Sequence, residues 1–502
     1  MTLGRFTVAG VLCGVALFAC RPDSAVTPAS TQQVAAAVAS ATMSLASNAA
    51  EGSGRYLVVF KPGRSGAGAI DQELRSGGQL EGLHEELDFA VVAGLSAVAA
   101  ARLRSSPDVS AVEADIEFSL EPMGERKALS GIELGPQSPT APQTAALFGV
   151  QWNMRAIGAH TAWAAGFLGS PSVSVAIIDS GIDYLWPDLA GRVDLARSIS
   201  MVPDDDALVT AFFPSRHPIT DLVFHGTLVS SIVASNSFGF AGVTTRTTLF
   251  GVKVCGLFTC SALTTLRGIL YAADHGADVI NLSLGGDFLK RAAPGAVSVF
   301  SRVINYAGAR GALIVVASGN DANDLDHNGD EYSSFCNAPH VVCVSATGPT
   351  AAPTLFGPFT NPDAIAPYTN YGRSVISLAA PGGGLTNPEN PNLYITGPCS
   401  STALLAHLTP PETPGGPPGP PVIDGLACPL PVFWFVSAPG TSFSSPHVAG
   451  AAAQLVALMG PGKPSQIRAA LAKSADDLGQ PGTDPFYGRG RLNFARAVGA
   501  IP

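Results

Sequence analysis

The apolar positions of this chain fall into short continuous runs, most of them followed by a stretch of helical spacing. The runs are rich in Val, Ile, Leu and Ala, which is typical of strands buried on both faces. They occupy 173–178, 249–254, 279–284, 313–317, 341–345 and 375–379, and the helical stretches occupy about 226–235, 261–276, 298–310 and 448–459. Strands that alternate with helices predict an α/β fold, with a mostly parallel sheet and helices on both faces.

A different pattern precedes this region. Strand-like runs and helical stretches follow one another at 55–60, 67–75, 89–94, 96–105 and 109–118. Residues 54–120 therefore predict a compact α+β unit, and an independent small binding module would show the same pattern. Residues 121–147 contain several Pro, Gly and Ser, so we expect an exposed linker in which a maturation cleavage occurs.

The N-terminus has the features of an export signal. A basic residue precedes a short apolar run, so we expect residues 1–20 to act as a signal peptide. The run ends in Leu17-Phe18-Ala19-Cys20, which resembles a bacterial lipobox. Acylation of Cys20 would attach the protein to a membrane, and ordinary cleavage nearby is the alternative. Residues 21–53 predict a spacer, and we expect a protein that is secreted or lipid-anchored in the bacterial envelope.

Composition narrows the classes of partner. The 502 residues are 46% hydrophobic and 13% charged, which is enough to bury a large core. The 28 Lys and Arg face 38 Asp and Glu, giving a formal charge of −10, and no block rich in Lys and Arg occurs that could follow a phosphate backbone. We therefore expect no nucleic-acid partner.

Six cysteines remain beyond the predicted signal. Six cysteines allow fifteen connectivities, and in an oxidising compartment we expect the sequence-local pairing. The pairs would be Cys255 with Cys260, Cys336 with Cys343, and Cys399 with Cys428. A zinc site is the rival interpretation, which the spacing disfavours because Cys-x2-Cys pairs are absent from the sequence.

Three polar residues stand at the ends of predicted elements. Asp179 follows the run 173–178, His225 precedes a predicted helix, and Ser442 lies at the start of another. Taken singly, they are a turn residue, a satisfied histidine and an N-cap serine. Together they supply a nucleophile, the base that the nucleophile needs and a carboxylate that can orient the base.

Four segments resemble the signature motifs of the subtilisin-like serine peptidases (subtilases, peptidase family S8), in that family's order. They are Ala176-Ile177-Ile178-Asp179-Ser180-Gly181-Ile182-Asp183, His225-Gly226-Thr227, Val316-Ala317-Ser318-Gly319-Asn320 and Gly440-Thr441-Ser442-Phe443-Ser444-Ser445-Pro446-His447-Val448-Ala449-Gly450. The resemblance covers about 150–500 and implies a subtilisin-like three-layer peptidase domain over 148–502. Residues 54–120 resemble the inhibitor I9-type propeptide that precedes many of these enzymes.

The resemblance assigns a role to each motif residue. His225 would act as general base and acid, Asp179 would orient the imidazole, and Ser442 would attack the peptide carbonyl. The backbone N–H of Ser442 and the side-chain amide of Asn320 would stabilise the oxyanion. The chain would be a monomeric endopeptidase that cleaves polypeptides without a catalytic cofactor, made as a self-processing zymogen that its own propeptide inhibits. A catalytically silent secreted binding protein on the same scaffold is the alternative.

The resemblance also places two substrate-binding segments. Ser283-Leu284-Gly285 belongs to a strand that would pair with an extended peptide, and Ala317-Ser318-Gly319 would form the facing wall of the primary pocket. Neither segment identifies the floor of that pocket, so a broad or apolar side-chain preference is the default expectation.

Two departures from the family pattern stand out. Leu228 occupies a position where the family often has a second histidine, and we expect it not to touch the proton relay. The segment of about 386–437 is longer than usual, with a Pro-rich centre at 410–421 that predicts an extended, solvated loop. This insertion would either gate or lengthen the substrate cleft, or be a passive surface feature.

A structural calcium ion is implied by the resemblance alone. Asp188 resembles the family's calcium-ligating aspartate, and Asn236 with Gln151 would complete an oxygen cage. A helix-start residue is the alternative for Asp188. The acidic loop 321–330 lacks the closing Glu of a calcium loop, so we expect it to be solvated.

Overall fold

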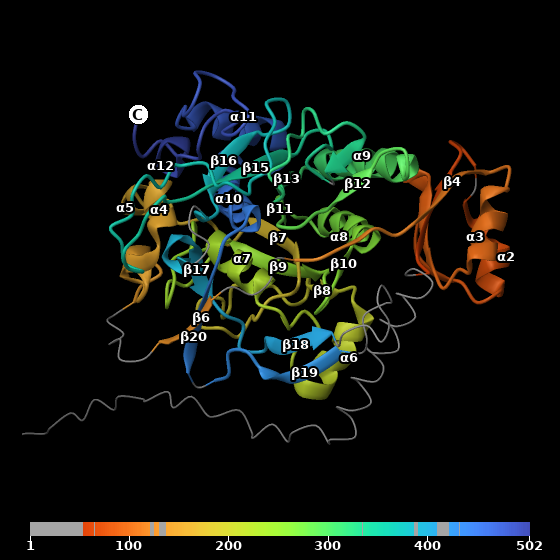
Figure 1. Ribbon diagram of the computed structural model, residues 1–502, viewed down its shortest axis with the longest axis horizontal. Helices are drawn as coiled ribbons and strands as arrows, with labels where there is room; N and C mark the ends of the chain where they lie inside the picture. Colours follow the sequence, from red (N-terminus) through yellow and green to blue (C-terminus); the bar gives the residue numbers. More distant parts are fainter. Residues whose placement is uncertain are drawn as a thin grey trace, which may run out of the picture.

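The structure is a computed structural model (Figure 1). It describes residues 54–64, 66–120, 125–129, 137–333, 335–385, 390–408, 421–430 and 432–502. The predicted signal, Cys20 and spacer lie outside these residues, as does 410–420 of the Pro-rich centre. In the part of the chain that is described, no helix is both long and apolar enough to span a bilayer.

The centre of the molecule is a sheet of seven parallel strands in the order β16-β15-β13-β11-β7-β9-β8. The strands are β7 (Ser174–Asp179), β8 (Ile199–Ser200), β9 (Thr248–Lys253), β11 (Val279–Leu282), β13 (Leu313–Ala317), β15 (Val342–Thr347) and β16 (Leu378–Pro381). All six predicted runs contribute a strand. The seventh, β8, has only two residues and carries no periodicity that a sequence could reveal.

Helices cover both faces of this sheet, as Figure 1 shows. One face carries α7 (His225–Val233), α10 (Ser445–Met459) and α11 (Pro464–Ser474), and the other carries α8 (Ala262–Asp274) and α9 (Pro294–Ala309). Along β7, Val175 and Ile177 enter the first core while Ala176 and Ile178 enter the second. Both faces are therefore buried, which explains the continuous apolar runs and confirms the three-layer α/β architecture.

The N-terminal unit forms its own antiparallel sheet in the order β2-β3-β1-β4, at the side of the large domain in Figure 1. Its elements are β1 (Tyr56–Phe60), α2 (Gly66–Arg75), β2 (Gln79–His84), β3 (Phe89–Ala93), α3 (Ala97–Arg104) and β4 (Val109–Ala114). Helices α2 and α3 cover one face, and Leu57 and Phe89 on the other face join the core of α8 and α9. The sequence did not predict β2, because its side chains are only partly buried and do not alternate.

The described flanks of the Pro-rich centre are strands. β17 (Ile395–Pro398) and β20 (Phe433–Ala438) form a three-stranded antiparallel sheet with β6 (Glu125–Leu129). β18 (Leu404–Leu408) and β19 (Pro421–Leu426) form a hairpin that packs against α6 (Pro203–Phe212) through Leu404. Leu228 is buried and packs against Gly397 of β17, where even an added Cβ would lie 2.0 Å from it. The insertion therefore rests on the helix that begins with His225.

The remaining elements are short. They are β5 (Glu117–Phe118) paired with β10 (Cys260–Ser261), β12 (Asp287–Leu289) paired with β14 (Glu331–Ser333), the helices α4 (Trp152–Ala156), α5 (Ala159–Ala164) and α12 (Phe494–Ala497), and the 3-10 turns η1 (Glu85–Leu87), η2 (Pro142–Thr144), η3 (Phe148–Val150), η4 (Pro391–Leu393) and η5 (Thr441–Phe443). Disulfides join Cys255 to Cys260, Cys336 to Cys343, and Cys399 to Cys428, which is the predicted local pairing.

Candidate active site

Asp179 and His225 meet at the carboxyl end of the parallel sheet. Asp179 is the last residue of β7 and His225 the first of α7. Asp179 Oδ1 lies 2.8 Å from His225 Nδ1 and also accepts a hydrogen bond from Ser180 N at 2.7 Å. Both side chains are fully buried. A carboxylate on Nδ1 fixes the imidazole so that Nε2 is the nitrogen available to a neighbouring hydroxyl.

A second buried carboxylate, Asp221, holds this arrangement in place. Its Oδ1 accepts hydrogen bonds from Ser180 Oγ at 3.0 Å and Val223 N at 2.9 Å, and its Oδ2 accepts from the N–H and hydroxyl of Thr227 at 3.0 and 2.6 Å. Burial raises the pKa of Asp221, against these hydrogen bonds. The sequence gave no sign of this role, since an aspartate in a polar loop is an ordinary turn residue.

The backbone around His225 is constrained. Phe224, which precedes it, is fully buried and has φ of 147°, a region that L side chains rarely adopt. Its N–H donates to Asp221 Oδ1 at 3.1 Å, which helps to hold this conformation. A Cβ added to Gly226 would lie 2.1 Å from the carbonyl oxygen of Gly181, so only glycine fits after the histidine. Strain of this kind persists where the surroundings over-determine it, and it clusters at active sites.

The insertion contributes to the same support. Ser400 Oγ and Thr402 Oγ1 both donate to the carbonyl oxygen of Asp221, at 2.7 and 2.8 Å. Leu404 N donates to the carbonyl oxygen of Leu222 at 2.9 Å. The described part of the insertion is therefore tied to the loop that leads into His225.

Ser442 lies in η5, directly before α10, and is buried. Helix α7 contacts η5, and the ring of Phe443 lies 5.4 Å from the ring of His225, so the fold brings this turn beside the imidazole. Ser283 Oγ donates to the carbonyl oxygen of Ser442 at 2.7 Å. Ser283 was expected to bind substrate, but it is fully buried behind Ser442 and does not line the cavity.

His447 anchors the same turn from inside α10. Its Nδ1 lies 2.7 Å from the carbonyl oxygen of Phe443, and its Nε2 lies 2.9 Å from Asn153 Nδ2. A carbonyl on one nitrogen and an amide donor on the other define a neutral imidazole with its proton on Nδ1. Burial lowers the pKa of His447 to about 4, which keeps the ring neutral.

The side-chain amide of Asn320 has a defined orientation. Its Oδ1 accepts hydrogen bonds from Thr441 N and Thr441 Oγ1, both at 2.9 Å. The amide is planar, so its N–H groups point away from Thr441. Asn320 and Ser442 line the same cavity, which is the position an oxyanion donor requires.

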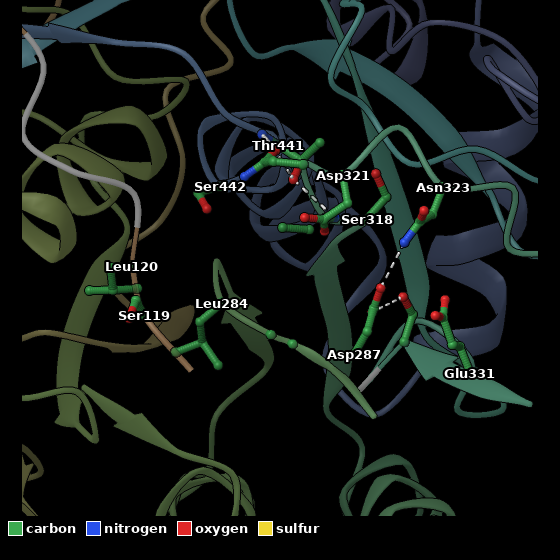
Figure 2. Close-up of a pocket in the computed structure, with 16 residues that line it drawn as sticks. Ser119, Leu120, Leu284, Asp287, Ser318, Asp321, Asn323, Glu331, Thr441 and Ser442 are labelled. Carbon is green, nitrogen blue, oxygen red and sulfur yellow. Dashed lines mark hydrogen bonds between the residues drawn. The ribbon is translucent and has the colours of Figure 1, made fainter. Parts of the chain in front are cut away.

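That cavity has a volume of about 500 Å³ (Figure 2). Its walls include Leu284-Gly285 and Ala317-Ser318-Gly319, so five of the six expected substrate-binding residues lie together beside Ser442. Ser119 and Leu120 of the N-terminal unit also line it, on the side of Ser442 in Figure 2. The sequence did not single out Asp287, Asn323 or Glu331, which line the opposite side.

The expected calcium cage does not form. Asp188 is fully buried, and its Oδ1 accepts hydrogen bonds from Gly239 N at 2.9 Å, Phe240 N at 3.1 Å and Ser235 Oγ at 3.1 Å. Burial raises the pKa of Asp188 to about 6. N–H groups that point at a carboxylate carry partial positive charge, so this position does not suit a cation.

The other two residues expected in the cage are also engaged. Asn236 Oδ1 accepts from the guanidinium of Arg192 at 2.8 Å, and Gln151 Oε1 accepts from Ala241 N at 2.8 Å. A positively charged side chain thus takes one of the oxygens that calcium would need. Within the described residues, no group of three or more His, Cys, Asp and Glu is placed to hold a metal ion.

Comparisons with known proteins decide the family. Residues 170–490 match the family described as Peptidase_S8, the Subtilase family. The chain belongs to the subtilase family. Thermitase of Thermoactinomyces vulgaris is 29% identical over 351 residues, which cover 69% of this subtilase and 95% of thermitase. The thermophilic serine proteinase of Bacillus sp. (strain AK1) is 28% identical over 334 residues, which cover 66% of this subtilase and only 62% of that protein.

Solved structures share the fold of this subtilase. The epidermin leader peptide processing serine protease of Staphylococcus aureus superposes with a TM-score of 0.63 at 19% identity, over 88% of this chain and 97% of that one. Fervidolysin of Fervidobacterium pennivorans superposes with a TM-score of 0.58 at 20% identity, over 89% and 60% of the two chains. Family membership makes this subtilase a serine endopeptidase.

Proposed function

We propose that this subtilase hydrolyses peptide bonds with Asp179, His225 and Ser442 as its catalytic triad. The observation that carries the proposal is the 2.8 Å contact between Asp179 Oδ1 and His225 Nδ1, fully buried beside the turn that holds Ser442. A buried carboxylate–imidazole pair next to a serine at a cavity wall has the parts that acyl transfer needs.

In the proposed mechanism, Ser442 Oγ attacks the carbonyl carbon of the substrate while His225 Nε2 takes the hydroxyl proton. Asp179 stabilises the imidazolium that forms and stays ionised. The N–H of Ser442 and the amide N–H of Asn320 stabilise the oxyanion. His225 then gives its proton to the leaving amine, and water cleaves the acyl-enzyme by the same steps in reverse order.

The N-terminal unit is proposed to act as a propeptide that blocks the cleft. Two contacts support this role: β5 pairs with β10 of the large domain, and the two residues that follow β5, Ser119 and Leu120, line the cavity with Ser442. A chain end that occupies the cleft excludes substrate until it is removed. The proposed zymogen is exported, consistent with three disulfides and with the signal expected at residues 1–20.

A fluorophosphonate probe tests the proposal, because it reacts covalently only with an activated serine. We expect label on Ser442 in matured wild-type protein and none in Ser442→Ala. Ser465→Ala is the matched control, since Ser465 is an exposed serine on α11. Absence of label in correctly matured wild-type protein would favour the silent binding protein instead.

Processing of the N-terminal unit gives a second readout. We expect Ser442→Ala to keep residues 54–120 attached, while wild type and Ser465→Ala release them. Mass spectrometry of purified protein measures this directly, and normal release from Ser442→Ala in the absence of other proteases would contradict self-processing.

A further inference from the structure

The cavity beside Ser442 is negatively charged. Three carboxylates line it, Asp287, Asp321 and Glu331, and no Lys, Arg or His does so among the described residues. Composition does not explain this bias, since basic residues make up 28 of the 66 charged side chains of the chain. The expectation of a broad or apolar preference took no account of these residues, because the floor of the pocket could not be identified from the motifs.

The carboxylates come from the two segments that form the walls of the cavity. Asp287 directly follows Gly285 and Gly286, and Asp321 directly follows Asn320. Pairing of β12 with β14 brings the Glu331 end of β14 into the same cavity as Asp287, although the two residues are far apart in sequence. Figure 2 shows Asp287 and Glu331 together on the side of the cavity opposite Ser442.

The charge of Asp287 is not neutralised by its neighbours. Its Oδ1 accepts a hydrogen bond from Ser333 Oγ at 2.5 Å and its Oδ2 accepts one from Asn323 Nδ2 at 3.1 Å, and both donors are neutral. The ion pairs of the described residues include neither Asp287 nor Glu331.

The nearest basic residues along the chain are engaged elsewhere. Arg291, shortly after β12, pairs with Asp330 at 2.6 Å, and Lys290 Nζ donates to the carbonyl oxygen of Gly329 at 3.3 Å. Neither residue lines the cavity. A cation brought by a substrate would therefore meet carboxylates that lack a positively charged partner, where charge-assisted hydrogen bonds are strong.

The chain itself shows that a peptide fits this cleft. The segment from β5 to Leu120 enters the cavity, and Phe118 packs against Gly286, where an added Cβ would lie 3.0 Å from its Cβ. The carbonyl to be attacked must lie by Ser442 and Asn320, so the side chain of the residue before the cleaved bond extends between the two walls. Lys and Arg have the length and charge to reach the carboxylates at the far end.

We propose that this subtilase selects polypeptides with Lys or Arg immediately before the cleaved bond, and that Asp287 and Glu331 determine this preference. The proposal rests on the proposed function of Ser442. It replaces the expected broad or apolar preference with a definite substrate class.

Matched peptide p-nitroanilides that differ only in the residue before the scissile bond test it with matured enzyme. We expect kcat/KM for Arg and Lys to exceed that for Leu by about 10- to 100-fold, the range of a hydrogen bond to a charged group. Glu should be the poorest residue. A kcat/KM for Leu or Phe equal to or above that for Arg would overturn the proposal.

Two neutral variants separate the effect of charge from that of packing. Glu331→Gln and Asp287→Asn should each reduce kcat/KM for Arg about tenfold and leave that for Leu within about twofold, because shape is kept while charge is lost. Glu331 is the safer site, since its side chain makes no hydrogen bond or ion pair in the described residues. Equal losses for Arg and Leu in Glu331→Gln would overturn the assignment.

Salt provides a readout that a purely structural role would not give. The carboxylates are partly or fully exposed, so raising the salt from about 0.05 M to about 1 M should lower the Arg-to-Leu ratio in wild type and leave it nearly constant in Glu331→Gln. An unchanged wild-type ratio would count against charge selection. Fluorophosphonate labelling of each preparation keeps the two proposals apart: labelled enzyme with no basic preference refutes only the specificity, and unlabelled enzyme refutes the proposed function.

Discussion

Asp179 and Asp188 lie in one segment of the chain and are both fully buried, yet they have different kinds of partner. Asp179 faces the imidazole of His225, a ring that can gain and lose a proton. Asp188 faces two backbone N–H groups and the hydroxyl of Ser235, none of which changes charge near neutral pH. Burial alone therefore does not make a carboxylate functional. The partner decides whether it supports a reaction or anchors a loop.

The largest effect that this comparison predicts is on Asp179→Asn. An amide in this place no longer selects the correct tautomer of His225, so we expect kcat to fall about 10⁴-fold while the apparent Tm changes little. Burst-phase kinetics and thermal melts measure the two quantities. A loss of less than about tenfold would show that Asp179 does not act on the imidazole.

Asp221→Asn should affect both quantities. Replacing one carboxylate oxygen by an N–H₂ group sets it against donors from Ser180 or Thr227, which disturbs the start of α7. We expect kcat to fall about 10- to 100-fold with KM unchanged, as for a misplaced catalytic group, and the apparent Tm to fall as well. An unchanged kcat would place Asp221 with Asp188 as a purely structural carboxylate.

Asp188→Ala should affect stability alone. It leaves buried N–H groups of Gly239 and Phe240 without their acceptor, at a cost of about 3 kcal/mol, or roughly 5–10 °C in apparent Tm. Melts are best recorded in a Ser442→Ala background, which prevents self-digestion. A parallel loss of kcat/KM in folded, active Asp188→Ala enzyme would blur the distinction from Asp179.

The pH dependence of stability sharpens the same point. Burial raises the pKa of Asp188 in the folded protein to about 6, above its ordinary value of 3.8. A raised pKa contributes stability at low pH that is lost as the pH rises through about 6, so this group should cost up to about 3 kcal/mol between pH 4 and 7. We expect Asp188→Asn, which resembles the protonated acid, to lack this loss.

His447 works in the opposite direction. Its pKa is lowered from 6.5 to about 4 in the folded protein, so it destabilises the fold as the pH falls from 6.5 to 4. His447→Gln is therefore the control that separates the two slopes. A wild-type slope that neither variant changes would contradict both assignments.

Removal of calcium should have the smallest effect. Because N–H donors and Arg192 occupy the oxygens of the expected cage, chelation with EDTA should shift the apparent Tm by less than about 2 °C. Melts with excess calcium and with EDTA measure this. A large shift that Asp188→Ala abolishes would restore the calcium prediction.

Much of the fold followed from local pattern. The six apolar runs became strands because burial on both faces demands continuous apolar residues, and the glycine-flanked turns fixed where Asp179, His225 and Ser442 begin or end an element. The strands β2 and β8 were missed because partial burial and short length leave no periodicity. Ser283 was assigned to the wrong side of the nucleophile, since a motif gives the segment but not the direction of each side chain.

The sequence by itself determined the family, the order of the motifs and the chemistry that each motif residue can supply, because these depend on residue type and local spacing. Tertiary structure alone decided which groups meet: Asp221 behind Asp179, N–H groups instead of calcium at Asp188, and Asp287 with Glu331 in one cavity. The physical reason is that hydrogen bonds and fields act over a few ångströms between residues far apart in the chain, and only the packing of strands and loops sets those distances.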